Sequence, residues 1–127
     1  MPSLNLRIVP GRYAVARLAP DADIPAWING PGFSAFSRAD DEVSVVCLED
    51  RVPISVTAQR EWACLRSVGP FPFDAAGIVA ALIDPISAAG IGVFVLCTYD
   101  GEHLLVDAAQ LGKVQELLCA AGHRFVD

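Results

Sequence analysis

One stretch of this sequence constrains the fold more than any other, because residues 75–97 are almost wholly apolar. The stretch is long enough to cross a bilayer, but Asp84-Pro85 interrupts it and no basic flank orients it. A buried helix over residues 75–89, followed by a strand over residues 91–97 that is buried on both faces, explains it better. We expect Gly90 to end the helix, and the proline to kink it or leave it one backbone hydrogen bond short.

Regular patterns continue on both sides of this stretch. Asp74 and Asp107 stand where two helices would begin and are the expected N-caps, and Asp100-Gly101 is a typical hairpin pair. The further elements expected here are strands over residues 62–68, 103–106 and 124–126 and a helix between Asp107 and Gly122. This order is βαββαβ, so the sequence predicts an α+β, ferredoxin-like fold in which an antiparallel sheet carries both helices on one face.

The first half of the chain has a weaker pattern. Pro10-Gly11 is expected to turn the first two strands into a hairpin, and residues 49–60 are the least regular region. The expected elements are strands over residues 4–9, 13–18, 33–38 and 43–48 and a short helix over residues 21–28. This half resembles a degenerate copy of the second, so we predict two tandem modules, over residues 1–58 and 59–127.

Composition excludes some partners and favours others. Apolar residues make up 54% of the chain and charged residues only 19%, which leaves apolar surface for a homodimer. The net charge is -6 and no basic cluster occurs, so a phosphate backbone would be repelled and nucleic acid is not an expected partner. The scattered basic residues form no lipid-binding patch, so no membrane contact is expected either.

The four cysteines are far apart in sequence and lie among apolar neighbours. They are Cys47, Cys64, Cys97 and Cys119. Their spacing fits neither a zinc site nor a redox pair, so buried free thiols are expected. Free thiols suit a reducing compartment, and the first residues carry no basic or apolar leader pattern. We therefore expect a cytoplasmic protein with no metal and no cofactor.

Several segments of the second half together resemble a known family. They are Glu61–Arg66, Gly69–Phe73, Pro85–Phe94, Thr98–Asp100 and Leu104–Val106. These segments are similar to the ACT-like domains of small bacterial proteins related to the CASTOR arginine sensors, which pair two ACT-type modules. The first half is similar to that family only in its general layout.

The resemblance implies that an amino acid binds at an interface between modules or subunits. The ligand loops of the family correspond to Gly90, Ile91 and Gly92 and to Thr98, Tyr99 and Asp100. One departure is that relatives usually carry a Thr-Asp-aromatic run where this chain has Gly101-Glu102-His103. The polar groups that define the ligand can therefore differ here, or the pocket can be lost.

The chemistry of an amino acid fits these loops. Backbone N–H groups around Gly90–Gly92 can bind a carboxylate without side-chain obstruction, and Asp100 can accept hydrogen bonds from an ammonium group. A simpler interpretation stays open, in which Gly90 only stops a helix and Asp100-Gly101 only forms a turn. Asp74 can likewise be a ligand group, although an N-cap is the more common role.

Catalysis has little support in the sequence. The histidines are His103, which we expect on the surface of a strand, and His123, which follows a helix end that favours a cationic ring. Neither stands in a recognisable nucleophile motif, and no phosphate-binding loop or HExxH motif occurs. The acidic residues of the first half sit at turns, where solvated carboxylates are common.

These observations predict a regulatory module that binds a small-molecule amino acid and has no catalytic activity. Its further partners would be a second copy of the chain and possible partner enzymes or regulators. The alternative is a structural or protein-interaction module that dimerises and binds no ligand. The sequence leaves open which amino acid is bound and which protein is regulated.

Overall fold

The computed structural model describes residues 2–127, which separate into two compact units. Unit 1 holds the described residues up to Val9 together with Ala63–Asp127. Unit 2 holds Pro10–Trp62. Within the described chain, no helix is long and apolar enough to cross a membrane.

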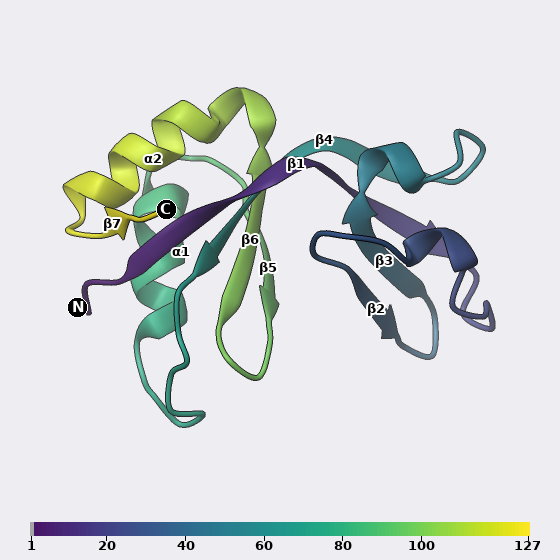
Figure 1. Ribbon diagram of the computed structural model, residues 1–127, viewed down its shortest axis with the longest axis horizontal. Helices are drawn as coiled ribbons and strands as arrows, with labels where there is room; N and C mark the ends of the chain where they lie inside the picture. Colours follow the sequence, from purple (N-terminus) through teal and green to yellow (C-terminus); the bar gives the residue numbers. More distant parts are fainter. Residues whose placement is uncertain (1) are drawn as a thin grey trace. The chain divides into compact units, whose positions relative to one another are not determined.

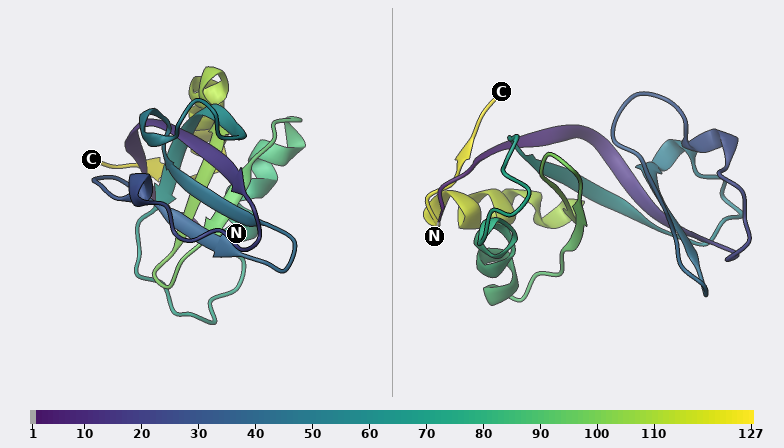
Figure 2. Two further views of the ribbon diagram at one scale, coloured as in Figure 1. Left: turned by 90° about the vertical axis from the view of Figure 1, so that its right-hand side faces the viewer. Right: turned by 90° about the horizontal axis from the view of Figure 1, so that it is seen from below.

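Unit 1 has the βαββαβ order that the sequence predicts, with one additional strand. Its elements are the first residues of β1 (Asn5–Leu18), the last residues of β4 (Ala58–Ser67), α1 (Ile78–Ala88), β5 (Phe94–Cys97), β6 (Glu102–Asp107), the short 3-10 turn η3 (Ala108–Gln110), α2 (Leu111–Ala120) and β7 (Arg124–Phe125). Neighbouring strands follow the order β7-β1-β4-β6-β5, and both helices cover one face of this sheet (Figures 1 and 2). The predicted α+β class and helix placement are confirmed.

The additional strand is the start of β1, which lies between β7 and β4. Asn5 and Leu6 pair in parallel with Arg124 and Phe125. In a split βαβ arrangement the last strand would lie beside β4, so β1 occupies that place. The N-terminal residues therefore pack with the second half of the chain, and the predicted module boundary between residues 58 and 59 stays a prediction.

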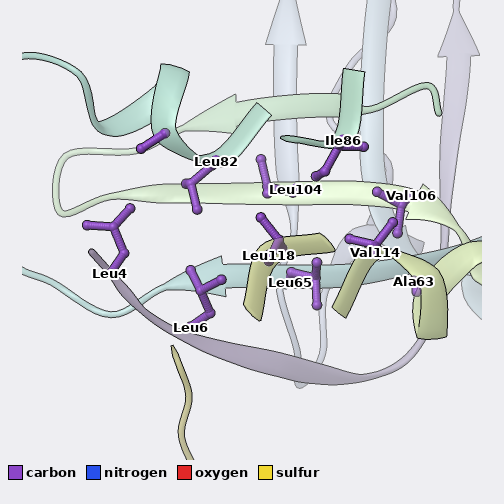
Figure 3. Close-up of a cluster of buried hydrophobic side chains, with 11 residues drawn as sticks. Leu4, Leu6, Ala63, Leu65, Leu82, Ile86, Leu104, Val106, Val114 and Leu118 are labelled. Atoms are coloured by element: carbon purple, nitrogen blue, oxygen red, sulfur yellow. The ribbon is translucent and has the colours of Figure 1, made fainter. Parts of the chain in front are cut away.

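The core of unit 1 lies between this sheet and the two helices (Figure 3). Alternate residues of each strand point to the helices, as the period of a strand requires. The buried members are Leu4, Leu6, Ala63, Leu65, Ala81, Leu82, Ile86, Leu104, Val106, Val114 and Leu118. Both helices thus bury their apolar faces against the same side of the sheet, which fixes the position of their ends.

Pro85 lies inside α1 and lacks the N–H that would bond to the carbonyl of Ala81 one turn earlier. His123 supplies the missing hydrogen-bond donor, because its Nε2 donates to that carbonyl at 2.8 Å. Its Nδ1 accepts from the N–H of Leu4 at 3.1 Å, so the ring is neutral with its proton on Nε2. The ring is only 4% exposed and joins the start of the chain, α1 and the end of α2. The expected cationic role of His123 is wrong.

Three other expectations in unit 1 need correction. The N-cap of α1 is Gly77, with a φ of 85° and no side-chain cap bond, so Asp74 does not begin the helix. β5 is the last strand in the order rather than a central one, and Phe94 and Cys97 at its ends are exposed. Asp107 caps the 3-10 turn η3 that leads into α2, because its Oδ1 accepts from the N–H of Ala109 at 3.0 Å. The prediction that it caps the second helix itself is wrong, since α2 begins after Gln110 without a side-chain cap bond.

Unit 2 is built from strands, without an α-helix among its residues. It holds the rest of β1, β2 (Ala35–Arg38), β3 (Val43–Leu48), the start of β4 and the 3-10 turns η1 (Ala26–Ile28) and η2 (Glu49–Arg51), with strands in the order β2-β3-β1-β4. The hairpin predicted at Pro10-Gly11 is wrong, since β1 is one continuous strand and Tyr13 to Leu18 pair with β3. The proline is exposed, and an exposed position is where a strand can accommodate the missing N–H.

The helix predicted over residues 21–28 is also wrong, because only the three residues of η1 are helical. Only one of these residues, Ile28, is buried, so the segment has no apolar face that would stabilise a longer helix. Arginine side chains hold the loops of this unit instead. Arg60 donates to the carbonyls of Glu49, Val52 and Pro53, at 3.0–3.3 Å, and Arg38 donates to those of Pro20 and Ala22.

Replacing His123 tests whether its two hydrogen bonds hold unit 1 together. His123→Ala leaves the Leu4 N–H and the Ala81 carbonyl buried without partners, and we expect the free energy of unfolding to fall by about 2–4 kcal/mol. Urea denaturation followed by circular dichroism measures the change. Arg124→Ala, at an exposed neighbouring position, is the control. Equal stability of the two variants would contradict this role of the ring.

Candidate functional site

The candidate site is a cavity of about 310 Å³ within unit 1. It lies where the loop from β4 to α1, the first turn of α1 and the β5–β6 hairpin meet, at one end of the unit (Figure 1). Its lining comprises Phe71, Pro72, Phe73, Ala75, Gly77, Ile78, Val79, Ala80, Cys97, Thr98, Tyr99, Asp100, Gly101 and Glu102. This volume is at the lower end of the range for ligand pockets, which suits one small molecule.

The open end of α1 forms one side of this cavity. The N–H groups at the start of a helix have no intrahelical partner, and the first helical bond here runs from the Ala81 N–H to the Gly77 carbonyl at 3.0 Å. Ile78, Val79 and Ala80 of this first turn line the cavity, and no side chain caps it. The helix end therefore offers N–H donors and a positive dipole end to an anionic group.

The β5–β6 hairpin forms the opposite side. Both the N–H and the hydroxyl of Thr98 donate to the Gly101 carbonyl, at 2.7 and 3.1 Å. This closes the turn predicted from Asp100-Gly101 and places Tyr99 and Asp100 at its tip. A Cβ atom on Gly69 would lie 2.4 Å from the Asp100 carbonyl oxygen, so only glycine lets the β4–α1 loop approach the hairpin so closely.

A second carboxylate in the lining is Glu102, which the sequence places in the departure from the family pattern and not among the predicted ligand residues. Its Oε1 accepts from the hydroxyl of Ser67 at 3.0 Å, and its N–H donates to that hydroxyl oxygen at 2.9 Å. Together with Asp100 it makes the cavity acidic, because none of the lining residues is basic. Ser67 and Glu102 are 35 positions apart in the sequence, so no local sequence pattern shows this contact. It becomes visible only when the pairing of β4 with β6 is known.

Aromatic rings stand at the mouth of the cavity. Phe73 and Tyr99 come from the two opposing loops, and their ring centroids lie 5.7 Å apart. Both side chains are more than 80% exposed, whereas Phe71 packs against the core. The cavity thus combines an apolar rim with acidic groups and helix N–H donors.

The other predicted site residues lie elsewhere. Gly90, Ile91 and Gly92 follow the C-terminal end of α1 and precede β5, whereas the cavity adjoins the N-terminal end of α1 and follows β5. Gly90 has a φ of 77° and donates to the Ser87 carbonyl, as a helix stop does. Within one chain, the structure brings Thr98, Tyr99 and Asp100 to the cavity and leaves Gly90–Gly92 outside it.

The cysteines divide into two pairs. Cys47 and Cys64 are buried, and burial raises the pKa of both thiols, that of Cys64 to about 12. Cys97, at the edge of the cavity, and Cys119 are exposed, so the expectation of four buried thiols is half wrong. All four are free, and no group of three potential metal ligands occurs among the described residues.

His103 is buried, not on the surface as expected, since it is only 9% exposed. It lies in β6 opposite Leu96 of β5. Burial, and to a lesser extent the positive charge of Arg66, lower the pKa of His103 to about 4. The ring is therefore neutral at pH 7.

The lowered pKa of His103 predicts a loss of stability in acid. In the unfolded state His103 has a pKa near 6.5 and takes up a proton as the pH falls below that value. In the folded state it stays neutral down to about pH 4. We expect this residue to remove up to about 3 kcal/mol of stability as pH falls across that window, and nothing above it. Urea unfolding of the wild type and His103→Gln at several pH values measures the difference. A constant difference between pH 7 and pH 4 would contradict the prediction.

Two family models match the chain. The model described as ACT domain matches residues 57–120, and a model for an N-terminal domain matches residues 11–55. The chain is 31% identical over 103 residues to the "Cytosolic arginine sensor for mTORC1 subunit 1" of Bos taurus, covering 71% of this chain and 31% of that protein. The human protein of the same name is 31% identical over 94 residues, covering 68% and 29%. The chain thus spans about a third of the length of these relatives.

Solved structures are similar over nearly the whole chain. A protein from Agobacterium tumefaciens is 47% identical with a TM-score of 0.94, covering 99% of this chain and 94% of that one. A protein of unknown function from Vibrio cholerae, described as a possible transport protein, is 14% identical with a TM-score of 0.76, covering 94% and 91%. Aspartate kinase from Clostridium acetobutylicum is 12% identical with a TM-score of 0.69, covering 95% and 35%. The last two likenesses concern the fold alone.

Proposed function

This chain belongs to the ACT domain family, and on that basis we propose that it is a regulatory module that binds a free amino acid in the cavity of unit 1. One observation carries the proposal: an uncapped helix end and carboxylates face each other across a small cavity. The helix end suits the carboxylate of the ligand, and Asp100 suits its ammonium group. The aromatic rim suits an apolar or extended side chain.

We propose L-arginine as the first ligand to test. The curated relatives are named as arginine sensors, and the cavity has two acidic lining residues, Asp100 and Glu102, and no basic one. An acidic side chain on the ligand would be repelled there, whereas a cationic one would be attracted. A guanidinium group can also stack on the rings of Phe73 and Tyr99.

Catalysis does not form part of this proposal. The lining includes Cys97 and Thr98 as possible nucleophiles, but no lining residue is a histidine that would act as their base. His103 is buried in β6 with a pKa lowered to about 4, and His123 is engaged by two backbone groups. We further propose a cytoplasmic location, in line with the "cytosolic" in the names of the relatives.

A homodimer would bring the two parts of the predicted site together. β5 is an unpaired edge strand with the sequence Phe-Val-Leu-Cys, which lacks the charges and prolines that protect such edges. If two copies pair antiparallel about the middle of β5, Phe94 lies opposite Cys97 of the partner subunit. The same register extends Gly92 towards Tyr99 of the partner subunit. The loops around Gly90–Gly92 and Thr98–Asp100 would then form one site from two subunits, as the family resemblance implies.

Ligand binding is tested with a thermal-shift panel of the twenty amino acids. A ligand at a hundred times its dissociation constant adds about 2.7 kcal/mol of stability, which raises Tm by several degrees. We expect L-arginine to give the largest shift and Asp100→Ala to reduce it. Asp84→Ala, an exposed carboxylate on α1 away from the cavity, is the control. A flat panel on a folded protein would instead favour an interaction module without a ligand.

The oligomeric state is tested by charging the edge strand. Phe94→Lys places a cation on the paired edge of each subunit, opposite Cys97 of the partner subunit, so we expect a monomer and weaker amino-acid binding. Ile8→Lys is a matched control, because Ile8 is 38% exposed and Phe94 is 37% exposed. Light scattering coupled to size exclusion gives the mass of each variant. A monomeric wild type, or a dimer that survives Phe94→Lys alone, would show that β5 is not the interface.

A further inference from the structure

A pair of reciprocal hydrogen bonds fixes Glu102 against the sheet. The hydroxyl of Ser67 donates to the carboxylate Oε1 at 3.0 Å and accepts from the N–H of the same residue at 2.9 Å. Ser67 is only 1% exposed, so this hydroxyl is held in the interior of unit 1. A buried donor that bonds to a carboxylate restricts the rotamers available to that carboxylate.

Gly101 makes this arrangement possible. A Cβ atom at position 101 would lie 2.6 Å from the Ser67 hydroxyl oxygen, so a side chain there would separate the hairpin from β4. Gly101 is itself buried, directly between the two acidic residues of the cavity. The close packing at this position therefore serves the Ser67–Glu102 contact.

The two acidic residues differ in how firmly they are held. Asp100 lies at the exposed tip of the hairpin, and among the described residues its carboxylate has no hydrogen-bond or ion-pair partner. Glu102 is half-buried, and one of its oxygens is engaged by Ser67, which leaves the other for a ligand. A carboxylate that is already ordered loses less conformational entropy when it binds an ammonium group.

We infer that Glu102 is the fixed acceptor for the ammonium group of the bound amino acid and that Ser67 is its positioning residue. This inference rests on the proposed amino-acid site. The ammonium group has three N–H donors, so it binds between the ordered Glu102 and the exposed Asp100. The α-carboxylate lies at the open end of α1. Selectivity for α-amino acids over their des-amino analogues then comes from Glu102.

The experiment is a cycle of variants and ligands measured by calorimetry. The ligands are L-arginine and its des-amino analogue, which keeps the carboxylate and the guanidinium group. Glu102→Gln should weaken arginine binding by about tenfold or more and should weaken binding of the analogue much less, because only arginine presents the ammonium group that contacts Glu102. Ser67→Ala should weaken arginine binding by about three- to tenfold.

The positioning role is separated from a general effect on folding by the double variant. If Ser67 acts through Glu102, then Ser67→Ala costs little further affinity in the Glu102→Gln background. Additive losses would overturn the positioning role. Thermal unfolding confirms that each variant is folded, and Asp84→Asn controls for the removal of a distant negative charge.

The outcomes separate this inference from the function on which it rests. A wild-type protein that binds no amino acid in the thermal-shift panel overturns the proposed function, and this inference with it, before any variant is made. A wild type that binds arginine while Glu102→Gln binds it equally well overturns only the role of Glu102. Equal losses for arginine and its des-amino analogue would also overturn that role, since the lost contact would not involve the ammonium group.

Discussion

The hydrogen bond between His123 and the Ala81 carbonyl holds the parts of unit 1 in place. Pro85 creates the need for it by withholding an N–H from the interior of α1. The ring of His123, which follows α2, donates to that carbonyl and also accepts from the N–H of Leu4. One side chain therefore connects α1 to the first and the last strand of unit 1. The open first turn of α1 forms a side of the cavity, and its position against the hairpin therefore depends on this buried ring.

The sequence predicts those features of the fold that local pattern determines. The helices and strands of unit 1 follow from apolar periodicity, and Asp107 and Gly122 enclose the segment that holds η3 and α2. The path of β1 is different, because Pro10-Gly11 is a strong turn signal that the pairing of Tyr13–Leu18 with β3 overrides. A proline at an exposed position of a strand costs little stability, but the local sequence does not show that Pro10 occupies such a position.

The candidate site shows the same division. Thr98, Tyr99 and Asp100 follow from the hairpin signal and the family resemblance, and the cavity includes all three. Glu102, the helix end at Ile78 and the buried Ser67 depend on contacts between distant segments, which periodicity does not report. The departure at Gly101-Glu102 looks like a lost motif in the sequence, whereas in the structure it forms a close packing contact and an oriented carboxylate.

The pairing of β7 with β1 has a consequence for biosynthesis. Unit 1 contains the beginning and the end of the described chain, since Leu6 pairs with Phe125 and Leu4 bonds to His123. A growing chain on the ribosome can complete unit 2 first, because its residues are contiguous. The strand that precedes unit 2 must wait for β4 and then for residues 123–125 before both of its neighbours exist. Until the core of unit 1 assembles, Leu4 and Leu6 are exposed apolar residues on a nascent chain, which is the kind of surface that chaperones bind.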